Sequence, residues 1–153
     1  MEKKKKLTCG ALIFYKNKML ICRPRWDSEI WNLPKGVKED NETTLDAAIR
    51  EIKEETNILI NEEDIVIDIG KQPYLKKKDI YLYVIILKNE PNDLKCNSFF
   101  ERDGKQFPEM VDYKWINPQE RGPYFSEKLN KSLNKVFEDK KCQLELLKEQ
   151  HKK

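Results

Sequence analysis

Residues 36–58, GVKEDNETTLDAAIREIKEETNI, are the part of the sequence that decides the fold. Within them, residues 43–56 predict an amphipathic helix that packs one face on a sheet. Thr43, followed three residues later by Asp46, predicts an N-cap pair where this helix begins. The apolar positions follow the i, i+3, i+4, i+7 spacing of one helical face: Leu45, Ala48, Ile49 and Ile52.

The same helix carries three glutamates, Glu51, Glu54 and Glu55, as i, i+3 and i+4 neighbours near its C-terminal end. Like charges at this spacing cost about 0.2–0.5 kcal/mol per pair, and the negative end of the helix dipole adds to the repulsion. A solvated charged surface is one explanation. The other is a divalent cation, and carboxylates without histidine or cysteine suit Mg²⁺ or Mn²⁺.

The residues before the helix favour the second explanation. Pro34, Lys35 and Gly36 predict a turn in which the glycine allows close approach of the backbone. Arg50 and Glu42 are spaced so that an ion pair between them would brace this turn against the helix.

Gly36, Glu42 and the run from Arg50 to Ile58 together resemble the Nudix box of the Nudix hydrolases. Asn57 stands where the family has glycine. Because this position ends the helix in a left-handed conformation, and asparagine is the usual substitute for glycine there, we expect the replacement to be tolerated.

The resemblance implies an α/β fold, a Nudix-like α/β/α sandwich with a mixed central sheet and a C-terminal helix. It covers most of the chain up to about residue 140. We expect one Nudix hydrolase domain over residues 1–153, with residues 1–6 and about 149–153 as flexible tails.

Apolar patterning along the chain agrees with this fold. A strand apolar on both faces, predicted over residues 79–87, implies helices on both sides of the sheet. Residues 88–108 form a long polar loop, and residues 23–40 are also loop-like. The other predicted elements are strands at 7–14, 19–22, 65–69 and 111–116, a hairpin turn at 16–18, and a helix from 126 to about 148.

The resemblance also implies roles for individual residues. The metal ligands would be the Gly36 carbonyl with Glu51, Glu54 and Glu55, while Arg50 would orient the glutamates and Glu42 would hold the turn. Glu51 is the first candidate for the general base. Glu109 is the second, as base or as an extra ligand, and the alternative for it is an ordinary exposed loop acid.

Nudix enzymes hydrolyse a nucleoside diphosphate linked to another group. Residues 31–36, WNLPKG, are similar to the lead-in of diadenosine polyphosphate hydrolases and of messenger-RNA decapping enzymes. Lys35 is either a phosphate contact or a solvated loop lysine, and Arg23 and Arg25 are further candidates for polyphosphate.

We therefore favour a dinucleoside polyphosphate, such as diadenosine tetraphosphate, as the substrate. The alternative is an RNA 5′-end pyrophosphohydrolase or decapping enzyme, with the terminal lysines as backbone contacts. A non-catalytic nucleotide-binding module is the hypothesis from another class, and the intact set of box carboxylates argues against it.

Aromatic residues offer candidate base-stacking positions. Tyr81 and Tyr83 project from one face of the same strand and either stack on a base or belong to the core. Phe99 and Phe100 in the long loop are either a second stacking platform or an anchor for that loop.

Composition sets limits on the remaining possibilities. The net charge is +3, which suits a phosphate-bearing partner. No apolar run approaches the roughly 20 residues of a membrane span, and MEKKKK is not followed by a signal-peptide core. We expect a cytoplasmic protein without membrane contact. The oligomeric state stays open.

Cysteine and histidine usage excludes several kinds of site. None of Cys9, Cys22, Cys96 and Cys142 forms a C-x-x-C pair, so zinc and redox motifs are not expected. Cys9 and Cys22 lie in apolar strand-like runs, which predicts reduced, structural cysteines. The single histidine, His151, lies in the terminal tail. Serine–histidine and cysteine–histidine catalysis are therefore not expected, and carboxylates must carry the chemistry.

Overall fold

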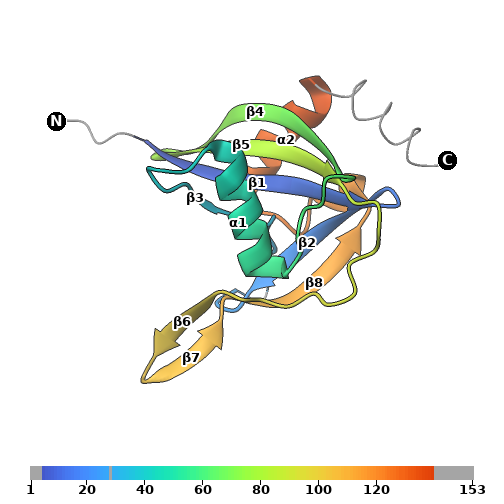
Figure 1. Cartoon of the computed structure of the whole chain (residues 1–153). Helices are drawn as coiled ribbons and strands as arrows, with labels where there is room; N and C mark the ends of the chain where they lie inside the picture. Colours follow the sequence, from blue (N-terminus) through green and yellow to red (C-terminus); the bar gives the residue numbers. More distant parts are fainter. Residues whose placement is uncertain (1–4, 28, 140–153) are drawn as a thin grey trace.

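The computed structural model of the chain describes residues 5–27 and 29–139 (Figure 1). Within these residues, six strands form one mixed sheet in the order β4-β5-β1-β2-β8, with β3 paired to β1. Its strands are β1 (Lys6–Tyr15), β2 (Lys18–Pro24), β3 (Lys35–Val37), β4 (Ile65–Leu75), β5 (Lys78–Ile86) and β8 (Met110–Ile116). Helices α1 (Thr44–Thr56) and α2 (Glu127–Asp139) pack on its two faces. The predicted α/β/α sandwich is thus confirmed.

Strand β5 lies between β4 and β1 and is parallel to β1. It is buried on both sides because its alternate residues enter two separate cores. One core includes Ile80, Leu82 and Val84 with Leu129 and Leu133 of α2. The other includes Tyr83 and Ile85 with Ala47, Ala48 and Ile52 of α1. The strand predicted at 79–87 is therefore covered by a helix on each face, as its apolar pattern predicted.

The hairpin predicted at 16–18 is present between β1 and β2. Lys16 and Asn17 have positive φ values of 47° and 69°, the combination that a two-residue turn needs to match the twist of the strands. Phe14 pairs with Met19 across this turn.

Two predicted loops contain strands. Residues 23–40 include β3, whose three residues carry little strand signal and are ordered by pairing with β1. Residues 88–108 include a separate hairpin, β6 (Phe99–Arg102) and β7 (Lys105–Pro108), which projects away from the sheet in Figure 1. Its turn is Asp103-Gly104, with both φ values positive, and Asp-Gly is a strong hairpin dipeptide.

Strand β4 is longer than the predicted 65–69. It continues to Leu75 through two register shifts, one between Asp68 and Gly70 and one before Leu75. Gly70, at φ 99°, and Pro73 interrupt the alternating pattern, and bulges absorb such interruptions without ending the strand.

The predicted C-terminal helix begins at Glu127, one residue later than expected. Its extension beyond residue 139, together with Cys142 and His151, lies outside the described residues. Cys9 and Cys22 are buried free thiols and Cys96 is a half-buried one. Among the residues that the structure describes, no helix is both long and apolar enough to cross a membrane.

Candidate active site

Both ends of helix α1 are fixed by specific caps. The Thr43 hydroxyl accepts a hydrogen bond from the Asp46 N–H at 3.1 Å, as predicted. At the other end Asn57 is left-handed, with φ 67°, and its N–H donates to the Lys53 carbonyl at 2.9 Å. The position where the Nudix box has glycine therefore keeps the required conformation.

The last four carbonyl groups of α1, those of residues 53–56, all accept hydrogen bonds from other parts of the chain. The Asn97 side chain and backbone N–H donate to the first two. The Tyr113 hydroxyl donates to the third and the Lys95 N–H to the fourth. Helices normally leave these four groups unpaired and partly negative. Their neutralisation lowers the electrostatic cost of placing three glutamates in the same two turns.

Replacing Tyr113 with phenylalanine should lower the free energy of unfolding by about 1 kcal/mol, because the Glu55 carbonyl loses its hydrogen bond in a half-buried position. Urea denaturation measures this change. Tyr15→Phe is the matched control, since the described residues give the Tyr15 hydroxyl no partner. Equal effects of the two changes would contradict the capping role of Tyr113.

Arg50 joins the turn before α1 to the glutamates on it. Its Nε and Nη2 donate to the two Glu42 carboxylate oxygens at 2.7 and 2.9 Å, and Nη2 also donates to the Val37 carbonyl at 3.2 Å. Its Nη1 donates to Glu51 Oε1 at 2.8 Å and lies 3.4 Å from the Glu54 oxygens. The predicted Arg50–Glu42 pair is present and bidentate, and it lowers the pKa of Glu42 to about 2.

Glu51 lies directly against Gly36. A Cβ atom at Gly36 would be 2.0 Å from the Glu51 Cδ and 2.2 Å from its Oε1, so the Glu51 carboxylate can occupy this position only beside a glycine. The register of β3 against β1, which pairs Gly36 with Cys9, sets this approach. Burial raises the pKa of Glu51 above its usual range.

Glu55 is the most enclosed of the three carboxylates, with 5% of its surface exposed. Its Oε1 accepts a hydrogen bond from the Lys35 backbone N–H at 2.8 Å. Burial raises the pKa of Glu55 to about 8, and the negative charges of Glu51 and Glu109 contribute to the increase. A divalent cation beside Glu55 would therefore strongly stabilise the ionised form of this carboxylate.

Glu109, between β7 and β8, belongs to the same group. Its charge contributes to the raised pKa of both Glu51 and Glu55, and its Oε1 accepts a hydrogen bond from Ser98 Oγ at 2.9 Å. Sequence reasoning missed Ser98, as well as Asn97 and Tyr113, which hold the end of α1. No motif spacing marks them, because the loop before β6 brings Asn97 and Ser98 there and strand β8 brings Tyr113.

The donor set suits a hard divalent cation, since it offers several carboxylate oxygens and a glycine carbonyl. In the conformation described for residues 5–27 and 29–139, however, no three acidic, cysteine or histidine side chains converge to form a finished metal site. Arg50 holds Glu51 and Glu54, and a backbone amide holds Glu55. Small side-chain rotations, with the helix unchanged, would free these oxygens.

The predicted phosphate-binding cations occupy different environments. The Lys35 ammonium lies 5.4 Å from the centre of the Tyr74 ring, and burial lowers its pKa. Arg23 is half-buried on β2 opposite Asp112. Arg25 is exposed, and its Nε donates a hydrogen bond to the carbonyl of Pro108, the last residue of β7. Contact of these residues with phosphate stays a prediction.

The two tyrosines of β5 lie beneath α1, with ring centres 5.3 Å apart. Tyr83 is 6% exposed, and its hydroxyl lies 2.6 Å from the Thr44 Oγ1. A ring so enclosed offers almost no face to a base, so the core alternative holds for Tyr83. Tyr81 is half-buried, and its hydroxyl donates to Asp68 at 2.9 Å. A stacking role for Tyr81 stays a prediction.

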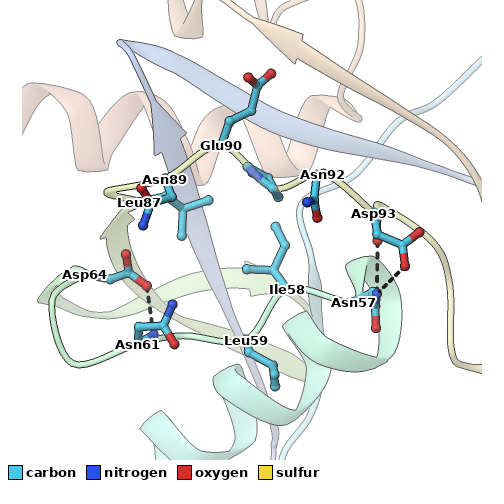
Figure 2. Close-up of a pocket in the computed structure, with 11 residues that line it drawn as sticks. Asn57, Ile58, Leu59, Asn61, Asp64, Leu87, Asn89, Glu90, Asn92 and Asp93 are labelled. Carbon is cyan, nitrogen blue, oxygen red and sulfur yellow. Dashed lines mark hydrogen bonds between the residues drawn. The ribbon is translucent and has the colours of Figure 1, made fainter.

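A separate pocket lies beyond the C-terminal end of α1 (Figure 2). Asn57 bridges part of its wall through a hydrogen bond to the Asp93 carbonyl, and Asp64 accepts one from the Asn61 N–H. The predicted catalytic and metal-ligating residues are not among the residues that line it. We therefore place the candidate active site at the β3–α1 junction, outside this pocket.

Comparison with known proteins gives a family-level match. The model of the NUDIX domain matches residues 4–139. An uncharacterised 17.7 kDa protein of Enterobacteria phage T4 is 34% identical over 113 residues, 70% of this chain and 74% of the phage protein. Nudix hydrolase 7 of Arabidopsis thaliana is 28% identical over 151 residues, 90% of this chain but only 49% of the plant protein.

Solved structures show the same fold at low sequence identity. The dihydroneopterin triphosphate pyrophosphohydrolase of E. coli superposes with a TM-score of 0.65 at 20% identity, covering 89% of this chain and 97% of that one. The Ap4A hydrolase of C. elegans, in a binary complex, superposes with a TM-score of 0.60 at 21% identity, covering 90% and 97%.

Proposed function

This chain belongs to the Nudix family of pyrophosphohydrolases, and we propose that it hydrolyses a phosphoanhydride bond of a dinucleoside polyphosphate with the help of Mg²⁺ or Mn²⁺. Family membership supports activity on nucleoside diphosphate derivatives. The particular substrate, the metal and the residue roles are our proposals.

One observation carries the proposal. Arg50 gathers Glu42, Glu51 and Glu54 beside the backbone of Gly36, while Glu55 is buried with its pKa raised to about 8. A surface with no ligand would gain nothing from burying an acid among other acids, since removing a carboxylate from water is costly. A divalent cation held by these oxygens reverses that cost.

Glu51, Glu54, Glu55 and the Gly36 carbonyl would hold the metal, which neutralises phosphate charge and polarises the phosphoryl oxygens. The chain's own residues do the rest. Arg50 keeps the glutamates oriented through its fixed planar fork. Glu51, whose pKa is raised by burial, is the first candidate to take a proton from the attacking water. Glu109 is the second, and Ser98 holds its carboxylate.

A dinucleoside polyphosphate is favoured over other nucleotides by the lead-in at residues 31–36. There Trp31 is buried, Pro34 directly precedes β3 where a turn was predicted, and Lys35 presents its backbone N–H to Glu55. The sequence similarity of this lead-in to diadenosine polyphosphate hydrolases supports the proposal, and its similarity to messenger-RNA decapping enzymes keeps an RNA 5′-end hydrolase as the alternative.

A Mg²⁺-dependent phosphate-release screen tests the substrate. We expect diadenosine tetraphosphate to be cut with a higher kcat/KM than capped RNA, nucleotide sugars or nucleoside triphosphates. Should capped or triphosphorylated RNA be preferred, the RNA 5′-end hydrolase replaces the dinucleoside hydrolase. Nucleotide binding with no Mg²⁺-stimulated release from any of these compounds would indicate a binding module instead.

A further inference from the structure

Three aromatic side chains form a group outside both cores, where β2 ends beside the β6–β7 hairpin. Phe100 and Phe107 are cross-strand partners with ring centres 5.9 Å apart. Trp26 meets Phe100 edge to face at 6.3 Å, and the Arg25 guanidinium lies over Phe107 at 5.2 Å. We call Trp26, Phe100, Phe107 and Arg25 the aromatic platform.

The exposure of Trp26 distinguishes this platform from an ordinary small core. Trp26 is 68% exposed, although it is the side chain that gains most from burial. Phe99, on the same hairpin, belongs to the opposite face, because successive side chains of a strand alternate. Phe100, itself packed on Phe107, thus contacts Trp26 edge to face, and much of the indole stays free.

The platform is joined to the candidate active site by backbone hydrogen bonds. The Arg25 N–H donates to the Glu109 carbonyl at 2.9 Å, and its Nε donates to the Pro108 carbonyl at 3.1 Å. Phe107 stands two residues before Glu109, at the end of β7. Glu109 in turn acts on the pKa of Glu51 and Glu55.

The turn of the hairpin is suited to holding this arrangement still. Asp103 and Gly104 adopt the paired positive φ values of a tight two-residue turn, 53° and 78°. The strand register runs from Phe99–Pro108 to Arg102–Lys105 without a shift. A fixed aromatic surface needs little ordering when a planar ligand binds, which favours affinity.

We propose that the aromatic platform binds the nucleobase of the substrate's second nucleoside, the one at the far end of the polyphosphate from the glutamates. Trp26 stacks on the base, and Arg25 supplies positive charge beside the phosphate chain. This inference rests on the proposed function, since it assigns a position to the second half of a dinucleoside polyphosphate. A one-base nucleotide would leave the platform empty.

The test is the dissociation constant of a methylene-bridged diadenosine tetraphosphate that cannot be hydrolysed, measured by calorimetry with Mg²⁺. For Trp26→Ala we expect this constant to rise about tenfold, the usual effect of losing one base stack. The constant for ATP should change less than about twofold. Trp26→Phe keeps an aromatic ring and should recover most of the affinity.

Phe99→Ala is the matched control, because it removes an exposed aromatic ring (53% exposed) from the other face of the same hairpin. It should leave both dissociation constants unchanged. An unchanged constant for the diadenosine analogue in Trp26→Ala overturns the proposal. An equal loss for ATP overturns it as well, since that result would place the first base on Trp26.

The second base on the platform could belong to a dinucleoside polyphosphate or to RNA. The dissociation constant of a 5′-triphosphorylated RNA dinucleotide distinguishes these two ligands. If Trp26→Ala weakens the RNA and spares the diadenosine analogue, the dinucleoside assignment is wrong. Failure of the proposed function gives a different result. In that case the wild-type protein binds the analogue through Trp26 yet does not hydrolyse diadenosine tetraphosphate.

Discussion

Replacing Glu55 with glutamine should remove nearly all Mg²⁺-dependent turnover while leaving the fold intact. The amide keeps an oxygen that accepts the Lys35 N–H but lacks the negative charge that a metal ligand needs. Replacing a residue that hydrogen-bonds to a metal ligand typically lowers metal affinity or activity about 10–100-fold. Replacing a ligand itself should therefore lower activity about 100-fold or more. Steady-state kinetics across a Mg²⁺ titration measures the effect.

Thermal unfolding of the same Glu55→Gln protein should give a melting temperature equal to or above that of the wild type. Glu55 is 5% exposed and its pKa is raised to about 8, so near pH 7 folding requires this carboxyl to take up a proton. A neutral amide removes that cost. Glu62→Gln, at an exposed residue, serves as the control and should keep full activity. Wild-type turnover in Glu55→Gln would disprove its assignment as a ligand.

Replacing Gly36 with alanine should reduce activity about as much as replacing Glu51 with glutamine, about 100-fold or more if Glu51 is a ligand. The new Cβ would fall 2.0 Å from the Glu51 Cδ, so the carboxylate must rotate out of its position. Because the displaced group is the end of a flexible side chain, we expect a loss of only about 1 kcal/mol in the free energy of unfolding.

A double variant separates displacement of Glu51 from general damage. Once Glu51 is already glutamine, adding Gly36→Ala should cause little further loss, since the two changes act on the same carboxylate. Gly122→Ala is the control, because a Cβ at Gly122 meets nothing within 4 Å. Additive effects of Gly36→Ala and Glu51→Gln would mean that Gly36 acts independently of Glu51.

The sequence predicted the elements whose signals are local. The helix at 43–56, its Thr43 cap, the left-handed Asn57 and the two-faced strand at 79–87 all follow from spacing and residue type. The Arg50–Glu42 pair could also be predicted, because both residues belong to one motif. What the sequence could not give is anything decided by distant parts of the chain.

Strand β3 shows why. Its three residues have no strand pattern of their own, and they are ordered by antiparallel pairing with β1. Tyr113 and Asn97 likewise reach the end of α1 from segments some forty to sixty residues away. The β6–β7 hairpin differs from these cases, because its Asp103-Gly104 turn is a local sequence signal from which a hairpin can be predicted. There the polar composition of residues 88–108 outweighed a valid local signal.

The parallel pairing of β1 with β5 has a consequence for how this protein forms. Thr8 pairs with Ile80, so about seventy residues must be looped together before the two strands meet, and α1 lies inside that loop. Closing so long a loop is slow and entropically unfavourable. During synthesis α1 therefore emerges after β1, β2 and β3 but before β4, β5 and β8, which complete the sheet. Because Glu109 follows β5 in the sequence, the candidate active site is complete only after β5 has left the ribosome.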